Sequence, residues 1–319
     1  MSLMNQQKMA TRGRSAKRIV DGLLILDKPT GMTSNAALQR VKWLFQARKA
    51  GHTGSLDPLA SGVLPLCFGQ ATKLSGYLLD SDKSYRVTAC FGARTDTADA
   101  DGEIVERCEP GIVSQAQLQS ALAGLRGEID QVPPMYSALK KDGVRLYELA
   151  RAGQEVVREP RRVTIHELEI EAYDPRRPVL TVRCSKGTYV RTLVEDLARA
   201  CGSLAHVECL RRTGVGSLTN QRIWRLDEIE AVAEAGVEAL DALLLPADQA
   251  IADWPAVELG AHEAYYLRQG HAVAAAGQGR SPGRVRLYGE GHGFLGIGEV
   301  LGDGRVAPKR LLVNAESGG

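Results

Sequence analysis

Apolar residues recur along the chain with two different spacings, and these spacings divide it into strands and helices. Residues 23–26 form a short apolar run, typical of a buried strand, that leads into a turn at residues 28–31 (KPTG). Beyond this turn, apolar side chains follow at intervals of three or four over residues 38–45. This spacing predicts an amphipathic helix, with Ser34 or Asn35 as its N-cap residue.

The same two patterns continue through the middle of the chain. Alternating apolar and polar residues at 85–91, and similar runs at 163–171 and 179–184, predict half-buried strands. Helical spacing appears over residues 114–125 and again over residues 191–198. Together these elements indicate a mixed sheet with flanking helices, so the predicted fold class is α+β.

The texture of the sequence changes near residue 245. From there on, short strand-like pieces alternate with many glycines, among them Gly289, Gly291, Gly293, Gly296 and Gly298. This pattern predicts a small, mostly β domain from about residue 250. The length of 319 residues agrees with this division, because it is enough for about two domains with separate cores.

Composition places the chain among ordinary globular proteins, with 44% hydrophobic and 24% charged residues. No apolar run approaches the roughly 20 residues that span a bilayer, and no secretory leader is recognisable, so we expect a cytoplasmic protein. Six cysteines occur without a Cys-x-x-Cys pair, which favours reduced, mostly buried thiols: Cys67, Cys90, Cys108, Cys184, Cys201 and Cys209.

A formal net charge of +2 is too small to indicate a nucleic-acid-binding protein by itself, but the charge is unevenly distributed. Residues 1–20 contain five lysines and arginines and no acidic residue. We expect a disordered basic arm there, which is either simply solvated or in contact with phosphates. Residues 133–162 form a second basic segment, with seven basic and four acidic side chains.

One carboxylate is set in an unusual loop, residues 51–64 (GHTGSLDPLASGVL). Gly54 and Gly62 allow backbone dihedrals that are closed to other residues, while Pro58 disfavours the helical region for Asp57. The sequence therefore predicts a shaped loop around Asp57 and not a helix. Taken alone, Asp57 is as well explained by ordinary turn chemistry as by a function.

Four segments in fixed order closely resemble the bacterial TruB family of tRNA pseudouridine-55 synthases. They are residues 22–35 (GLLILDKPTGMTSN), 51–64, 83–87 (KSYRV) and 185–193 (SKGTYVRTL). The likeness continues through residues 205–207 (AHV) and 210–213 (LRRT), so that positions from about 20 to 315 follow the family order. Departures are minor, such as Ser55 at a variable motif position.

The resemblance implies a domain organisation. A pseudouridine synthase catalytic domain occupies residues 21–249, and an insertion at about 133–162 forms a thumb that closes over the RNA. Residues 250–315 correspond to a PUA-like RNA-binding domain that meets the acceptor stem of tRNA. The local pattern alone supports less: an exposed amphipathic helix near 146–150 and a β-rich accessory domain.

The resemblance also implies a catalytic site. Asp57 corresponds to the catalytic carboxylate, acting as nucleophile or as base, and Arg191 to the arginine beside it, which keeps it ionised by lowering its pKa. Tyr85 corresponds to the tyrosine that stacks on the target base and takes part in removing the C5 proton. Two of these residues also have simpler explanations. Arg191 could be an arginine on a helix surface, and Tyr85 an aromatic core residue of a strand.

Further residues are implied to bind the substrate. His52 corresponds to the histidine that fills the space left by the flipped uridine. Tyr189 and Leu210 are expected to line the pocket, and Lys28, with Lys73 as a weaker candidate, to meet phosphates. Core packing and surface solvation are the simpler alternatives for these side chains.

The expected reaction is an isomerisation without a redox step, so we expect no cofactor and no metal. Residues 97–102 (TADADG) are similar to a calcium loop, but Thr97 occupies the first ligand position and Cys108 the closing one. His206 and Cys209 offer at most an isolated pair of metal ligands. No phosphate-binding Gly-x-x-x-x-Gly-Lys motif is present in the sequence.

We therefore predict a monomeric enzyme that converts uridine 55 in the T-loop of tRNA to pseudouridine by base flipping, without guide RNA and without contact with a membrane. Two alternatives remain open on the sequence. One is a dyskerin-like, guide-RNA-dependent synthase with similar motifs. The other is a tRNA-binding or tRNA-folding protein in which Asp57 is only structural.

Overall fold

The computed structural model describes residues 17–109, 113–275 and 281–312, and these contain a large mixed sheet and a small separate one. The large sheet has the order β13-β1-β3-β12-β4-β11-β10-β7, with β2 paired to β3. Its strands are β1 (Gly22–Lys28), β2 (Ala50–His52), β3 (Ser61–Phe68), β4 (Lys83–Phe91), β7 (Gly127–Gln131), β10 (Arg161–Ala172), β11 (Val179–Cys184), β12 (Ala205–Val215) and β13 (Trp224–Arg225). The pairs β12–β3 and β1–β13 are parallel and the others are antiparallel, which confirms the predicted mixed sheet.

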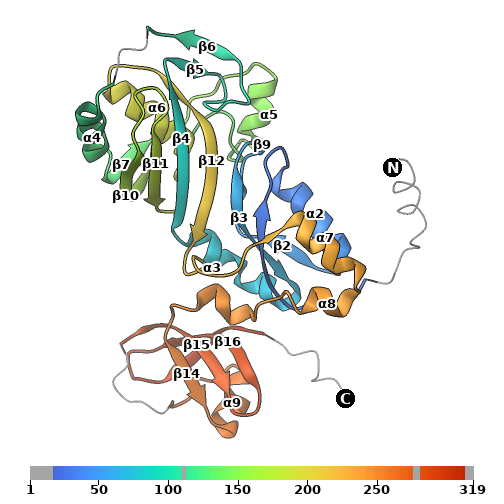
Figure 1. Cartoon of the computed structure of the whole chain (residues 1–319). Coiled ribbons are helices and arrows are strands. Elements are labelled where there is room, and N and C mark those ends of the chain that lie inside the picture. The colour runs from blue at the N-terminus through green and yellow to red at the C-terminus, as the bar shows by residue number, and fades with distance from the viewer. Residues whose placement is uncertain (1–16, 110–112, 276–280, 313–319) are drawn as a thin grey trace.

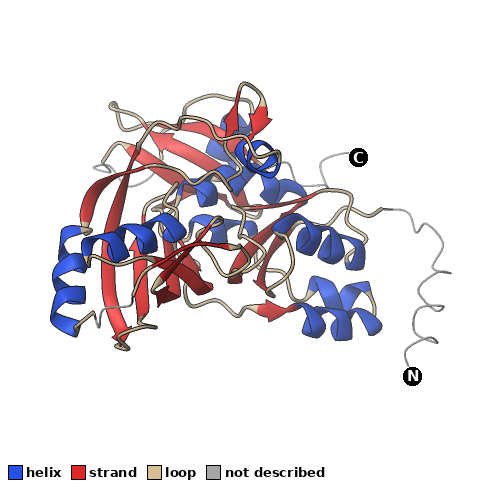
Figure 2. Cartoon of the chain, turned by 90° about the horizontal axis from the view of Figure 1, so that it is seen from above, coloured by secondary structure: helices blue, strands red, loops and turns tan. Residues whose placement is uncertain are grey.

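Helices pack against two separate parts of this sheet (Figures 1 and 2). Leu118 and Leu122 of α4 (Gln115–Gly124) and Leu197 of α6 (Val190–Ala200) share a core with β4, β10, β11 and β12. Val41 of α2 (Ser34–Leu44) and Ile229 of α7 (Leu226–Glu234) share another with β1 and β3. Shorter elements complete this part of the chain: η1 (Gly69–Leu74), α3 (Ser75–Asp80), β5 (Ala93–Thr95), β6 (Ile104–Arg107), β8 (Lys140–Lys141), β9 (Val144–Arg145), α5 (Leu146–Arg151), α8 (Val237–Asp241) and η2 (Ala247–Ile251).

The C-terminal part forms its own four-stranded sheet, order β14-β15-β16-β17, below the large one in Figure 1. It consists of β14 (Ala256–Leu259), α9 (Ala261–Arg268), β15 (Gly283–Gly289), β16 (Gly293–Val300) and β17 (Val306–Leu311). Because it also has its own hydrophobic cluster, the predicted β-rich C-terminal domain is confirmed. Ile297 belongs instead to a junction cluster that contains Leu23, Leu78 and Ile251 of the larger part.

Two local expectations are wrong, and a third lies mostly outside the described residues. The N-cap of α2 is Thr33, whose side chain accepts from the Ala36 N–H, because the Ser34 hydroxyl is used elsewhere. Most of the expected basic arm, residues 1–16, lies outside the described part; near its end, Arg18 forms paired bonds of 2.6 and 2.7 Å to Asp241. The cysteines are all free, but only Cys67 and Cys184 are buried.

Candidate active site

The loop that carries Asp57 is hydrogen bonded to Ser34 of α2 and to Gly31 in the turn after β1. The buried Ser34 hydroxyl accepts a bond of 2.7 Å from the Leu56 N–H and donates one of 3.1 Å to the Leu56 carbonyl. On the other side of Asp57, the Gly31 N–H donates to the Pro58 carbonyl at 2.8 Å. The two early motifs, residues 28–34 and 51–64, therefore form one structure that fixes Asp57 from both sides.

Gly62 closes this loop at a point where no side chain fits. Its φ is +103°, and a Cβ there would lie 2.1 Å from the Arg212 carbonyl oxygen. Its neighbour Arg212 is almost completely buried and donates from Nε to the Val63 carbonyl at 2.7 Å and from Nη2 to Gly54 at 3.3 Å. A glycine is needed here for two reasons: the backbone has a positive φ, and strands β3 and β12 approach each other closely.

Asp57 and Arg191 meet, as the sequence predicted. Arg191 Nη2 lies 2.9 Å from Asp57 Oδ2, and the arginine side chain is only 5% exposed against 43% for the aspartate. Arg191 lies in the first turn of α6 and is buried. A nearly buried guanidinium thus holds a carboxylate that stays open to a ligand.

Arg191 is itself held by segments from two other parts of the chain. Its Nη1 donates to the Thr97 carbonyl and its Nη2 to the Tyr136 carbonyl, each at 2.7 Å. The buried Asp99 carboxylate lies 3.6 Å from Nη1. Residues 97–102 do not fit a calcium loop, but Asp99 within them supports the site. No local pattern predicts this role, because Asp99 and Arg191 are far apart in the sequence.

The pKa of Asp57 departs from the expectation based on Arg191 alone. Burial raises the pKa of this carboxyl above its ordinary value, and Arg191 opposes the shift without reversing it. Asp99 adds to the rise and Lys28 opposes it. The predicted ion pair is present and Arg191 acts to lower the pKa of Asp57, as expected, but the net pKa is raised because desolvation is the larger effect.

Tyr85 and Leu210 lie on one face of neighbouring strands, beside the Asp57 loop. Leu210 is buried and shares a hydrophobic cluster with Tyr85 and Leu56. Tyr85 pairs in register with Arg212 of β12. Burial raises the pKa of the Tyr85 phenol while the Arg212 guanidinium opposes the rise.

Tyr189 and His52 flank the same region. Tyr189 is the N-cap residue of α6, two positions before Arg191, and burial raises the pKa of its phenol. His52 is the last residue of β2, five positions before Asp57, and burial lowers the pKa of its imidazole, with Arg212 adding to the shift. Its Nδ1 is buried and has no hydrogen-bond partner.

The proposed phosphate contact of Lys28 is not compatible with its position. The side chain is fully buried, and its Nζ donates to the carbonyls of Pro29 at 2.8 Å and Met32 at 2.6 Å. Burial lowers the pKa of this amine to about 8. Lys28 therefore shapes the turn beneath the Asp57 loop. Lys73 donates to the Leu311 carbonyl at 3.1 Å and so bridges to the C-terminal domain.

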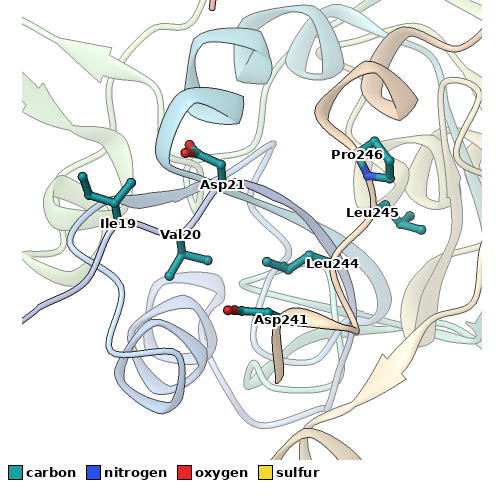
Figure 3. A pocket seen from close by; sticks show the side chains of 7 residues that line it. All are labelled: Ile19, Val20, Asp21, Asp241, Leu244, Leu245 and Pro246. Atoms are coloured by element: carbon teal, nitrogen blue, oxygen red, sulfur yellow. The ribbon is translucent and has the colours of Figure 1, made fainter. Parts of the chain in front are cut away.

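A hollow lies elsewhere, where the chain enters the fold (Figure 3). It is lined by Ile19, Val20, Asp21, Asp241, Leu244, Leu245 and Pro246, none of which belongs to the Asp57 loop. Among the residues that the structure describes, no three His, Cys, Asp or Glu side chains are grouped to hold a metal ion. Within the same ranges, no helix has the length and apolar character needed to cross a bilayer.

Comparison with known families accounts for nearly the whole chain. Residues 42–190 match the model of the TruB family pseudouridylate synthase N-terminal domain. Residues 191–252 match a tRNA pseudouridylate synthase B C-terminal domain, and residues 255–312 a pseudouridine synthase II TruB C-terminal model. The chain belongs to the TruB family of pseudouridylate synthases.

Curated relatives and solved structures agree with this family. A tRNA pseudouridine synthase B of Ectopseudomonas mendocina is 55% identical over 93% of this chain and 96% of its own length. One of Nitrosococcus oceani is 54% identical over 92% of this chain and 95% of its own. Two solved structures share the fold. A Cbf5-Nop10-Gar1 complex has a TM-score of 0.68 at 24% identity, covering 88% of this chain and 78% of its own. An H/ACA RNP bound to a substrate RNA has a TM-score of 0.71 at 21% identity, covering 92% and 86%.

Proposed function

We propose that this TruB-family protein is a stand-alone tRNA pseudouridine synthase that isomerises uridine 55 in the T-loop, with Asp57 as its catalytic carboxylate. The observation that carries the proposal is the half-open Asp57 carboxylate, paired at 2.9 Å with a nearly buried Arg191. The motifs that position the pair are the ones by which the chain resembles its family.

The reaction breaks the bond between ribose C1′ and uracil N1 and forms a bond between C1′ and C5. The proton on C5 is removed and N1 takes up a proton, so atoms and electrons balance without a cofactor. Asp57 acts as a nucleophile or as a base and stabilises positive charge that develops at C1′. Every one of these roles needs the ionised carboxylate, which Arg191 favours against the cost of burial.

The surrounding residues suit a uracil ring that has left its stack. Leu210 and Tyr189 offer apolar surface, and Tyr85 offers an aromatic face next to the carboxylate loop. Tyr85 takes part in removing the C5 proton late in the reaction as a phenolate, which becomes a phenol when it accepts the proton; the Arg212 guanidinium favours that phenolate against the cost of burial. His52, whose imidazole stays neutral near pH 7, takes the space of the flipped nucleotide.

Recognition of the RNA is proposed for two further regions. The insertion at 133–162 closes over the T-arm, and the C-terminal domain, of PUA type, meets the acceptor stem. The enzyme is proposed to act as a monomer and without guide RNA. Independence of a guide RNA is supported by the relatives named tRNA pseudouridine synthase B at 52–55% identity, against 20–24% for the Cbf5-containing structures.

The proposal is tested with an unmodified tRNA transcript and purified protein, without any guide RNA. Pseudouridine is mapped by carbodiimide-dependent primer extension, and a transcript with cytidine at position 55 serves as the matched control. We expect a single new stop at position 55 that the control transcript lacks. Modification at another position, or only after a guide RNA is added, would contradict the proposed specificity.

A further inference from the structure

A buried glutamine joins the base of the thumb to the helix that carries Arg191. Gln131 is the last residue of β7 and pairs in register with Arg161 of β10. These two residues mark where the 133–162 insertion leaves the large sheet and where it returns. Gln131 is only 2% exposed, although glutamine is normally a surface residue.

The side chain of Gln131 uses both ends of its amide on a single residue of the site. Its Oε1 accepts from the Tyr189 N–H at 2.7 Å, and its Nε2 donates to the Tyr189 carbonyl at 3.1 Å. Tyr189 is the N-cap residue of α6, and no side-chain capping bond is present at that end of the helix. Gln131 therefore fixes the backbone at the start of α6 as a neighbouring strand would.

The same region is tied a second time, through the guanidinium of Arg191. Arg191 Nη2 donates to the carbonyl of Tyr136, five residues beyond Gln131, and the same nitrogen lies 2.9 Å from Asp57 Oδ2. Pro133 and Pro134 stand between Gln131 and Tyr136 and restrict the backbone of that connection. The start of the thumb and the start of α6 thus form one closed loop of contacts around Arg191.

We infer that Gln131 is a positioning residue of the reaction, which holds the first turn of α6 so that Arg191 meets Asp57 in the reactive geometry. This inference rests on the proposed catalytic role of Asp57. Gln131 does not touch the reacting atoms and acts through Tyr189 and Arg191. The substitution Gln131→Met keeps the length and volume of the side chain and removes both bonds.

The variant is expected to change the rate of the reaction and its pH dependence more than RNA binding. Misplacing Arg191 lowers the single-turnover rate by roughly 10- to 100-fold, while KM for tRNA changes less than about threefold. The charged groups that face Asp57 are Arg191 from α6, Asp99 from the loop after β5 and Lys28 from β1. Weakening the Arg191 contact leaves Asp57 harder to ionise, so the acid limb of the pH–rate profile moves to higher pH.

The experiment compares wild type, Gln131→Met, Gln131→Glu and the control Gln119→Met, an exposed glutamine on α4. Gln131→Glu retains the acceptor for the Tyr189 N–H and is expected to fall between wild type and Gln131→Met in rate. Gln119→Met should match wild type. A loss confined to KM, or a lower rate with an unmoved acid limb, would overturn the positioning role.

Asp57→Asn is measured in parallel to separate two kinds of failure. If Asp57→Asn is inactive and Gln131→Met behaves as wild type, only the role of Gln131 is wrong. If Asp57→Asn keeps the wild-type rate, the proposed function of the site is wrong, whatever Gln131 does.

Discussion

At the scale of single residues, the site is defined by one buried cation between two carboxylates. Arg191 contacts Asp57 at 2.9 Å and Asp99 at 3.6 Å, and donates to two backbone carbonyls. Asp57 alone among these groups has a substantially exposed side chain. The arrangement leaves the Asp57 carboxylate partly exposed while Arg191 fixes its position, as a reaction on a bound nucleotide requires.

The net pKa of Asp57 leads to a pH prediction. Burial raises this pKa above the ordinary 3.8. As the pH is lowered, the single-turnover rate should therefore begin to fall at a higher pH than it would for an unperturbed aspartate. Asp99→Asn removes a charge that raises the pKa of Asp57, so its acid limb should move to lower pH, opposite to Gln131→Met. Rate measurements across the acid range check both directions. A limb that is unchanged in Asp99→Asn would contradict the electrostatic account.

At the scale of elements, the catalytic loop depends on contacts between segments far apart in sequence. Ser34 at the start of α2 bonds both polar groups of the Leu56 backbone, directly before Asp57. Gly62 at the start of β3 lets the loop rejoin the sheet against Arg212. Local sequence patterns thus determine each helix and strand, and a few hydrogen bonds between distant segments fix the position of the Asp57 loop.

Removing the Ser34 hydroxyl should loosen this loop. Ser34→Ala leaves the buried Leu56 N–H without its partner, which costs about 1–3 kcal/mol of unfolding free energy. The single-turnover rate should fall by more than the lost stability explains, because Asp57 directly follows Leu56. Urea unfolding and single-turnover rates are compared with Asn35→Ala, an exposed neighbour on the same helix. Equal behaviour of the two variants would count against a role of Ser34 in positioning.

Two glycines provide a matched test of backbone requirements. Gly62→Ala places a methyl group against the Arg212 carbonyl at positive φ and should cost about 3 kcal/mol or more. Gly76→Ala lies in α3, where a Cβ meets nothing within 4 Å, and should stabilise by about 0.5–1 kcal/mol. Thermal unfolding of both variants measures the contrast. A stable Gly62→Ala protein would show that the loop adapts where the structure predicts overlap.

The elements were largely predictable from sequence, and the contacts between them were not. Strand β1 and helices α4 and α6 follow from apolar spacing. The N-cap of α2 was assigned to the wrong residue, because Ser34 bonds a loop 22 positions away. Asp99 and Gln131 were missed for the same reason. The family motifs indicated Asp57 and Arg191, whereas burial of Lys28 and the net pKa of Asp57 required the structure.

At the scale of the whole molecule, the C-terminal domain packs directly against elements that lead into the site. Ile297 of β16 enters a cluster with Leu78 of α3. The end of α3 is held by Lys83, whose Nζ donates to the Leu79 carbonyl at 2.6 Å. Lys83 begins β4, the strand that carries Tyr85, so the domain junction and the site share a short connection.

The junction also contains an aromatic group that can be tested. Trp254 stacks edge to face on Tyr77 with ring centroids 5.1 Å apart, and Arg284 lies 5.2–5.6 Å from both rings. Trp254→Ala should lower the unfolding free energy by about 1–2 kcal/mol, more than Trp43→Ala on the exposed face of α2. It should weaken binding of full-length tRNA more than binding of an isolated T-arm. Equal effects on both RNAs would contradict contact of the C-terminal domain with the acceptor stem.

The most direct measurement of the central claim is tritium release from a tRNA transcript labelled at uridine C5, for wild type and Asp57→Asn. The pKa of Asp57 is higher in the folded protein than in the unfolded chain, so ionising Asp57 at neutral pH opposes folding. This cost is absent at pH values below the pKa of Asp57 in the unfolded chain. Replacing Asp57 by neutral Asn should therefore not lower Tm. We predict release by wild type that maps to position 55, and none by Asp57→Asn although it still binds tRNA. Release by Asp57→Asn at the wild-type rate, or binding without release by wild type, would contradict the account.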